Sequence, residues 1–324
     1  MSQQMPLRAA VKGSVERLIY SMEVMEMNRR SKVEWSNYLF ILPIFLLFAV
    51  FIIYPIVYNF IISFYEWSGV GNDKVYVGFQ NFVNLFQGQI IWKILRNFVI
   101  FALVTVIVQA IFGMLFASFF INRLRGSSVF RVLFYLPAVV TSTIIGQVFS
   151  KFFEANRGYL NTWLRSLGLK SLTRTWLADP KLALGCLCFV NIWQWTGYSM
   201  LLYYAGMLNI SNDLYEAAEI DGANKIQQFT RITFPLLRGT HFTVFILGML
   251  GSLKCYDIVY VLTDGGPNYA TEMFSTYIQK LSFNLFRQGD ASAVVVVMFI
   301  IAMVITAAQL MLYYRGDKDK ELAR

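Results

Sequence analysis

The sequence has little of what metal binding and redox chemistry require. Of its 324 residues, one is a histidine and three are cysteines. His241 has no cysteine or carboxylate close to it, which makes it a poor candidate for a metal ligand. Cys186 and Cys188 have a C-x-C spacing, unlike that of a zinc knuckle, and like Cys255 they stand in apolar runs. We therefore expect small core residues at these positions, with no disulfide framework and no metal site.

Nucleotide-binding and hydrolytic motifs are also missing. The chain contains no G-x-x-x-x-G-K-[ST] phosphate loop, no G-x-G-x-x-G turn after a strand and no H-E-x-x-H helix. Its carboxylates are scattered over loops and termini, so none of them form an evident acid–base pair. We expect a chain that is not an enzyme and that holds no cofactor itself. A membrane-embedded enzyme is disfavoured for the same reason.

Charged residues are scarce as well, at 15% of the sequence, whereas 57% of the residues are hydrophobic. Soluble domains carry about 25% charged residues, so this composition indicates an all-α integral membrane protein. A membrane-spanning helix needs about 20 apolar residues, and six runs meet that length. They cover residues 39–62, 97–121, 131–153, 182–206, 240–262 and 291–314. The net charge of +9 then favours membrane topology and contact with anionic membrane lipid, and no nucleic acid partner is expected.

The two ends of the chain are polar, which predicts a transmembrane domain over residues 38–315 and a tail over 316–324. Within residues 1–37 an apolar stripe recurs every three or four positions and predicts an amphipathic helix, with a weakly ordered tail as the alternative. The stripe consists of Leu7, Val11, Val15, Leu18, Met22 and Met25. Lysine and arginine are more frequent on the side of both termini, which predicts cytoplasmic N- and C-termini. A basic stretch from Lys151 to Lys181 departs from this bias.

Polar side chains interrupt the apolar runs at Gln109, Asn191, Gln194, Lys254 and Asp257. Such residues are costly in a membrane and usually face the interior of a helix bundle or an aqueous path. Lys254 and Asp257 are three residues apart, so on one helix they could pair with each other. Two interpretations therefore stay open for them, a structural ion pair near the outer interface and a role in a substrate path.

The fourth run combines hydrogen-bonding groups with aromatic rings. Asn191, Trp193, Trp195 and Tyr198 lie within eight consecutive positions. Aromatic faces stack on sugar rings, so this combination suits a carbohydrate ligand. A belt of aromatic residues at the membrane interface is the alternative.

A polar segment, residues 212–237, separates the fourth and fifth runs. Asp213 and Glu216 have the spacing of a capping box, which predicts a helix from Leu214, and Gly222 suits a left-handed stop. A second short helix should then run to about Thr233 and end at Pro235. The two helices and the turn between them would form a knob that projects from the membrane domain. Its first helix carries small residues, Ala217 and Ala218, and these allow a partner to approach the backbone closely.

The same segment contains the pattern EAA, three residues, G, nine residues, I-x-x-P. It is carried by Glu216, Ala217, Ala218, Asp221, Gly222, Ala223, Phe229, Ile232 and Pro235. This resembles the cytoplasmic signature loop of permease subunits of binding-protein-dependent ABC importers, with Phe234 in place of the usual leucine. Other stretches are similar to the carbohydrate branch, the maltose and glycerol-phosphate permeases. They are VGFQNF from Val77, FRVLFYLPAVV from Phe130 and VLTDGGPNYATE from Val261.

The resemblance implies a type I ABC importer permease fold in a bacterial inner membrane. It implies pairing with a second homologous permease, a dimer of ATPase subunits that binds ATP and Mg, and an extracytoplasmic solute-binding protein that delivers an oligosaccharide substrate. In such families the loop forms a coupling helix that seats in the ATPase. Carried over to this chain, the ATPase-coupling residues are Leu214, Glu216, Ala217, Ala218, Asp221, Gly222 and Ala223.

The resemblance also places the sugar on the two spans that flank the loop. By position the substrate-path residues are Asn191, Trp193, Tyr198 and the stretch around Lys254 and Cys255, to which Asp257 is added as a polar residue of the same run. Lys254 stands where the family has a neutral amide. Together with the basic stretch 151–181 it suggests an acidic oligosaccharide such as alginate, although basic loops could instead meet an acidic binding protein.

An ion-coupled secondary transporter is the alternative function, with Lys254 and Asp257 as a proton or ion relay. Such carriers commonly contain internal repeats, and the sequence shows none. A dependence of transport on ATP or on an ion gradient would separate the two.

Overall fold

The computed structural model describes residues 35–121 and 126–322. The amphipathic helix predicted within residues 1–37 therefore falls almost wholly outside the described residues. The chain divides between Tyr58 and Asn59 into two compact units. Helix α2 (Trp35–Phe48) continues through the π-helical turn η1 (Ala49–Ile53) into α3 (Tyr54–Ile62), and the boundary between the units falls within α3.

Two π-helical turns in the chain have the same relation to proline. Pro55 follows η1 after one residue, and Pro235 follows the turn η3 in the same way. In each case the residue before the proline donates its N–H to a carbonyl five positions back. A widened turn accommodates the proline ring, which would otherwise collide with the preceding turn. Both helices therefore pass through their prolines.

In the described residues of the second unit, the regular structure is helical apart from one short ladder. The strands β1 (Tyr65–Glu66) and β2 (Val75–Tyr76) pair antiparallel, with Tyr65 opposite Tyr76. The helical elements are α4 (Gln80–Gln87), α5 (Gln89–Ile121), α6 (Ser127–Val139), α7 (Ser142–Phe152), α8 (Tyr159–Ser166), η2 (Lys170–Leu172), α9 (Ala183–Leu208), α10 (Asn212–Ile220), α11 (Lys225–Gln228), η3 (Phe229–Thr233), α12 (Phe234–Leu236), α13 (Arg238–Leu253), α14 (Asp257–Leu262), α15 (Phe274–Gln279), η4 (Lys280–Asn284) and α16 (Gln288–Leu322).

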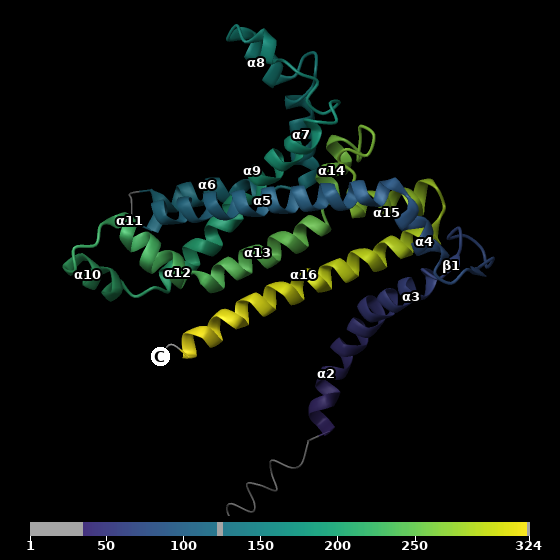
Figure 1. The fold of residues 1–324 in the computed structure, drawn as a ribbon, viewed down its shortest axis with the longest axis horizontal. Helices are drawn as coiled ribbons and strands as arrows, with labels where there is room; N and C mark the ends of the chain where they lie inside the picture. The colour runs from purple at the N-terminus through teal and green to yellow at the C-terminus, as the bar shows by residue number, and fades with distance from the viewer. Residues whose placement is uncertain (1–34, 122–125, 323–324) are drawn as a thin grey trace, which may run out of the picture. The chain divides into compact units, whose positions relative to one another are not determined.

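Long helices of this unit pack along one another. Helix α5 packs on α9 and α13, and α13 also packs on α16 (Figure 1). Helices α10 and α11 lie at one end of this bundle, while α4 and α15 lie at the other (Figure 1). The loop between the fourth and fifth predicted spans is thus presented at one end of the bundle.

Within the described residues, three helices are long and apolar enough to cross a membrane: Phe40–Ile62, Gln89–Ile121 and Gln288–Arg315. Up to five crossings result if each of two bent helix pairs counts as one. Helix α9 has 26 residues but is not among them, because Asn191, Gln194 and neighbouring small and aromatic residues lower its apolar content. The helical membrane architecture is confirmed, while the count of six spans stays a prediction.

Two of the predicted spans are interrupted. Residues 131–153 form α6 and α7, which meet at 92°, and the extended residues Val140 and Thr141 follow Pro137 in the last turn of α6. Residues 240–262 form α13 and α14, with residues 254–256 between them. This second break places Lys254 and Asp257 at helix ends, where polar groups are free to face a cavity.

One part of the core of the second unit lies between α5 and α9. Phe101 of α5 and Leu187 and Val190 of α9 are fully buried there. The close approach of α5 to α9 depends on Gly113 of α5, because a β-carbon at that position would lie 2.9 Å from the backbone nitrogen of Met200 in α9. Small residues at such crossings are the usual way for membrane helices to gain packing contacts. The α5–α9 pair is therefore the frame on which the polar residues of both helices are held.

Candidate functional site

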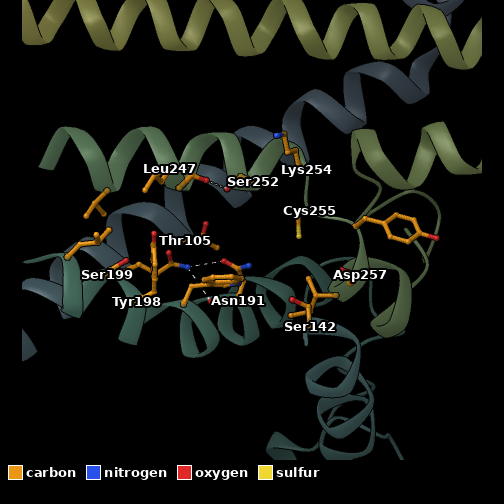
Figure 2. A pocket seen from close by; sticks show the side chains of 18 residues that line it. Thr105, Ser142, Asn191, Tyr198, Ser199, Leu247, Ser252, Lys254, Cys255 and Asp257 are labelled. Carbon is orange, nitrogen blue, oxygen red and sulfur yellow. Dashed lines mark hydrogen bonds between the residues drawn. The ribbon is translucent and has the colours of Figure 1, made fainter. Parts of the chain in front are cut away.

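A cavity of about 470 Å³ lies where α5, α9 and α13 meet the start of α14. Figure 2 shows it between α13 above and α9 below, with Asn191 and Tyr198 on the α9 side and Ser252 on the α13 side. Thr105 and Gln109 of α5 also line the cavity. Its walls mix hydroxyl and amide groups with aromatic and aliphatic surface, which is the usual composition of a small-molecule pocket.

The amide groups in the wall are held by hydrogen bonds between helices. Gln109 Nε2 donates to Asn191 Oδ1 over 2.9 Å and to the Asn191 backbone oxygen over 3.3 Å. Near the bend after α6, Gln194 Nε2 donates to the Val140 carbonyl over 3.2 Å, and Ser142 Oγ bonds the Gln194 side chain. Buried amides need such partners in a low-dielectric interior. The Asn191 side chain is thereby fixed in orientation, with hydrogen-bonding capacity left over.

Lys254 and Asp257 both line the cavity, but they do not lie on one helix. Lys254 is the residue after α13, and Asp257 is the first residue of α14. Among the described residues no ion pair joins them, so the pairing considered from their spacing is wrong. The break at residues 254–256 separates the two side chains. Both are exposed, and Lys254 stands at the rim, at the end of α13 (Figure 2).

The aromatic residues of α9 divide between two faces. Trp195 and Tyr198 line the cavity with their rings at 89° and their centroids 6.1 Å apart. Trp193 does not line it and instead packs edge-on against Phe149 of α7, with ring centroids 5.3 Å apart. The structure thus brings Asn191, Tyr198, Lys254 and Asp257 together and places Trp193 elsewhere.

Small hydroxyl residues of the lining were not identified from the sequence. They are Thr105, Ser142, Ser199 and Ser252. Thr105 and Ser252 each donate to a carbonyl one turn earlier in their own helix, over 2.7 Å and 2.9 Å, and so lie easily within apolar segments. Thr105 could have been identified from the sequence, because it lies one helical turn before the polar residue Gln109 and therefore on the same face of the helix. In the described part of the chain, no group of three His, Cys, Asp or Glu side chains could hold a metal ion.

The loop after α9 begins with a capped helix. The cap of α10 is Ser211, whose hydroxyl accepts from the Asp213 backbone N–H over 3.3 Å. The helix thus starts two residues before Leu214, and the predicted Asp213–Glu216 capping box is wrong, because Ser211 supplies the acceptor first. Gly222 is left-handed at φ +77°, as predicted for the stop after the helix.

The second half of the loop runs further than predicted. Asn224 and Gln227 form a capping box at the start of α11, which continues through η3 into α12. The helix ends at Leu236, one residue after Pro235, and a bend of 64° separates it from α13. The predicted end near Thr233 is three residues early, because the π-turn before Pro235 accommodates the proline ring. Tyr215 and Thr233 join the two halves by a hydroxyl–hydroxyl bond of 2.8 Å.

The surface of the loop faces outward. No residue of α10 is buried, and Ile220 and Ile226 are 87% and 75% exposed although both are large and apolar. Lys225 forms an ion pair with Glu219 across the Gly222 turn, and its hydrogen bond lowers the pKa of the Glu219 carboxyl. Exposed isoleucines on a rigid polar loop are typical of a surface that another protein covers.

Comparisons with known proteins agree with this arrangement. Residues 109–315 match the family described as "Binding-protein-dependent transport system inner membrane component". The chain is 34% identical over 284 residues to the probable ABC transporter permease protein YurN of Bacillus subtilis, covering 87% of this chain and 97% of YurN. It is 33% identical over 293 residues to the trehalose/maltose transport system permease protein MalF of Thermococcus litoralis, covering 88% and 97%.

A solved structure has the same fold. It is a chain from a bacterial ABC transporter involved in the import of the acidic polysaccharide alginate, with a TM-score of 0.77 and 24% identity, covering 90% of this chain and 99% of that one. The matched family region includes the cavity-lining parts of α9 and α13 and the whole loop between them. The chain therefore belongs to the binding-protein-dependent transport system inner membrane components, the family of ABC transporter permeases.

Proposed function

We propose that this chain is a permease subunit of an ATP-driven importer that takes up an acidic oligosaccharide by alternating access. A partner ATPase binds the 212–237 loop and hydrolyses ATP. The cavity between α9 and α13 forms part of the sugar path. A second homologous permease completes that path, and an extracytoplasmic binding protein delivers the sugar at the opposite face. Six spans with cytoplasmic termini are part of this proposal, because that topology places the 212–237 loop on the side of the ATPase.

The observation that carries the proposal is the direct connection of cavity and loop. Helix α9 contributes Asn191 and Tyr198 to the cavity and ends four residues before α10 begins. Helix α13 begins two residues after α12 ends, and it finishes at the rim residue Lys254. Because helices move as nearly rigid bodies, a displacement of the loop changes the spacing of the two cavity walls. A separate motor at the loop can thereby open and close the path.

The acidic nature of the substrate is inferred from Lys254 and the basic stretch 151–181. The Lys254 ammonium is exposed at the rim and makes no hydrogen bond or ion pair with the described residues. A cation in that position favours a carboxylate on a sugar ring, and cations on the approach raise the rate of capture. The structural neighbour is described as an importer of the acidic polysaccharide alginate, which is consistent with this inference. The relative MalF is instead named for the neutral sugars trehalose and maltose.

Replacing the rim lysine tests the substrate class. For Lys254→Gln we expect uptake of an oligouronate to lose roughly tenfold in apparent affinity, since a hydrogen bond to a charged group contributes about 1.5–3 kcal/mol. Uptake of a neutral oligosaccharide of equal length should change less than about twofold, because its hydroxyls accept from an amide as well as from an ammonium. Both are measured as initial rates in membrane vesicles that contain the whole transporter. Lys74→Gln, outside the cavity, serves as the matched control, and equal losses for both sugars would refute the acidic assignment.

The energy source separates the importer from an ion-coupled carrier. Vesicles that contain the transporter and its binding protein are expected to accumulate sugar when ATP is enclosed, and to continue after ionophores abolish the ion gradients. Vesicles without ATP should show no accumulation. Uptake that persists without ATP and stops when the gradient collapses would instead identify a secondary transporter.

A further inference from the structure

A second cavity, of about 740 Å³, lies at the other end of α9 from the 212–237 loop. Its walls are the first turns of α5 and of α9, together with residues 268–270 from the segment between α14 and α15. Asn97 of α5 holds that segment in place, because its amide donates to the carbonyl oxygens of Tyr269 and Glu272 over 3.0 Å and 3.1 Å. The cavity is therefore bounded on three sides by fixed backbone.

The charged residues that line this cavity are all cations. Lys93, Arg96 and Lys181 line it, and among the described lining residues none is acidic. Lys93 donates to the Asn268 carbonyl over 3.3 Å, whereas the charged groups of Arg96 and Lys181 make no hydrogen bond or ion pair with the described residues. Arg96 and Lys181 are exposed. The Asp179 carboxylate lies at the same turn, but it accepts the Lys181 backbone N–H over 2.9 Å and forms no ion pair with either cation, so both cationic groups remain available to an anion.

The start of α9 adds to this positive field. The first N–H group of this 26-residue helix, that of Ala183, donates to the Asp179 carbonyl over 2.9 Å, whereas the N-cap Leu182 offers no side-chain acceptor to the N–H groups of Leu184 and Gly185. Leu184 and Gly185, in its first turn, line the cavity. Unpaired N–H groups at a helix start carry partial positive charge and bind phosphate groups well. The anion favoured here is therefore one with several acceptor oxygens.

Below the charged rim the cavity is apolar. Ile100 and Val104 of α5 and Phe189 and Ile192 of α9 form this part of the lining. Val104 is eight residues beyond Arg96 on one helix, a descent of roughly 12 Å at 1.5 Å per residue. Gly185 leaves additional space, since a β-carbon there would meet no atom within 4 Å. The site thus combines a cationic rim with an apolar wall that follows a membrane-crossing helix downward.

We propose that this groove binds an anionic phospholipid, with the phosphate at Arg96, Lys181 and the start of α9 and one acyl chain against Ile100, Val104 and Phe189. A hydrophilic oligouronate would match the rim but not the apolar wall. A phospholipid matches both, because its charged and apolar parts follow each other in the order that the groove presents. The lipid would fasten the outer ends of α5 and α9 together, and this inference is independent of the transported sugar.

The test measures lipid retention on the complete transporter. The complex is reconstituted in nanodiscs of phosphatidylglycerol and phosphatidylcholine in equal amounts, and the lipids that stay bound after extraction are counted by native mass spectrometry. Wild-type complex should retain phosphatidylglycerol preferentially. The double variant Arg96→Gln, Lys181→Gln should reduce that preference roughly 10- to 30-fold, as expected for two surface cations. Gly185→Trp, which fills the groove without a backbone clash, should reduce retention of both lipids.

Matched variants control for general effects of charge and volume. Arg165→Gln with Lys170→Gln removes two exposed cations of the α8–η2 segment, outside the groove, and should leave retention unchanged. Gly251→Trp, at a glycine with equally open surroundings in the other cavity, should also leave it unchanged. Equal retention of the two phospholipids by wild-type complex would overturn the proposal, as would wild-type retention in Gly185→Trp.

Discussion

A Gly222→Pro chain is expected to insert into the membrane and to lose both ATPase binding and uptake. Gly222 has φ +77° and donates its N–H to the Glu219 carbonyl over 3.1 Å. Proline fixes φ near −65° and has no N–H, so the turn between α10 and α11 cannot form as it stands. A cost of about 3 kcal/mol lowers the population of the intact turn by roughly 100-fold. Co-purification of the ATPase and uptake in vesicles are the two measurements.

The chain offers a closely matched control at Gly168, which follows α8. Gly168 has φ +78° and donates to the Arg165 carbonyl over 3.1 Å, and at both glycines a β-carbon would meet no atom within 4 Å. Gly168→Pro therefore imposes the same local strain in a different segment. We expect it to retain ATPase binding, and we expect Gly222→Ala to be intermediate because a left-handed alanine costs about 1–2 kcal/mol. Normal ATPase binding by Gly222→Pro would contradict the assignment of this loop.

Gly251→Trp is expected to abolish uptake while the transporter assembles normally. Gly251 lines the cavity between α9 and α13, and a β-carbon there would meet no atom within 4 Å. An indole can therefore enter the space without displacing the backbone of α13 and would occupy the volume that a sugar ring needs. Uptake should fall at least about 100-fold, because a sugar could enter the cavity only by displacing the indole, at a free-energy cost of about 3 kcal/mol.

Assembly and coupling must be measured on the same preparations. Gly251→Trp should co-purify with its partners in wild-type amounts and still hydrolyse ATP, whereas Gly222→Pro should lose the ATPase. Gly251→Ala adds one methyl group to the same position and should keep most of the uptake. If Gly251→Trp transports at the wild-type rate, the cavity is not part of the path.

The features that could be predicted from sequence are those set by local chemistry. The left-handed Gly222, the exposed Ala217 of α10 and the membrane-length helices follow from residue types within one turn or one run. The start of α10 was displaced because Ser211, outside the pattern considered, reaches the Asp213 N–H first. The helix before Pro235 ends at Leu236, three residues later than predicted, because a π-turn, which no spacing rule predicts, precedes the proline.

The site itself depended on contacts between distant segments. Asn191 and Tyr198 belong to it because α9 packs on α5 with one particular face inward, and the same packing turns Trp193 toward Phe149. The break after α13 contains neither proline nor glycine, so the separation of Lys254 from Asp257 has no signal in the sequence. Thr105 and Ser252 return their hydroxyl bonds to their own helices and therefore resemble ordinary helix residues.

In the proposed transport cycle, a separate ATPase engages the 212–237 loop while substrate passes between α9 and α13. The most direct measurement introduces a photo-cross-linking phenylalanine analogue in place of Leu214, which is 46% exposed on α10, in the complete transporter. The same analogue in place of Trp163, 61% exposed on α8, provides the control. We expect position 214 to cross-link to the ATPase subunit and position 163 not to do so. Absence of any ATPase cross-link from position 214, in a transporter that still takes up sugar with ATP, would contradict the proposed cycle.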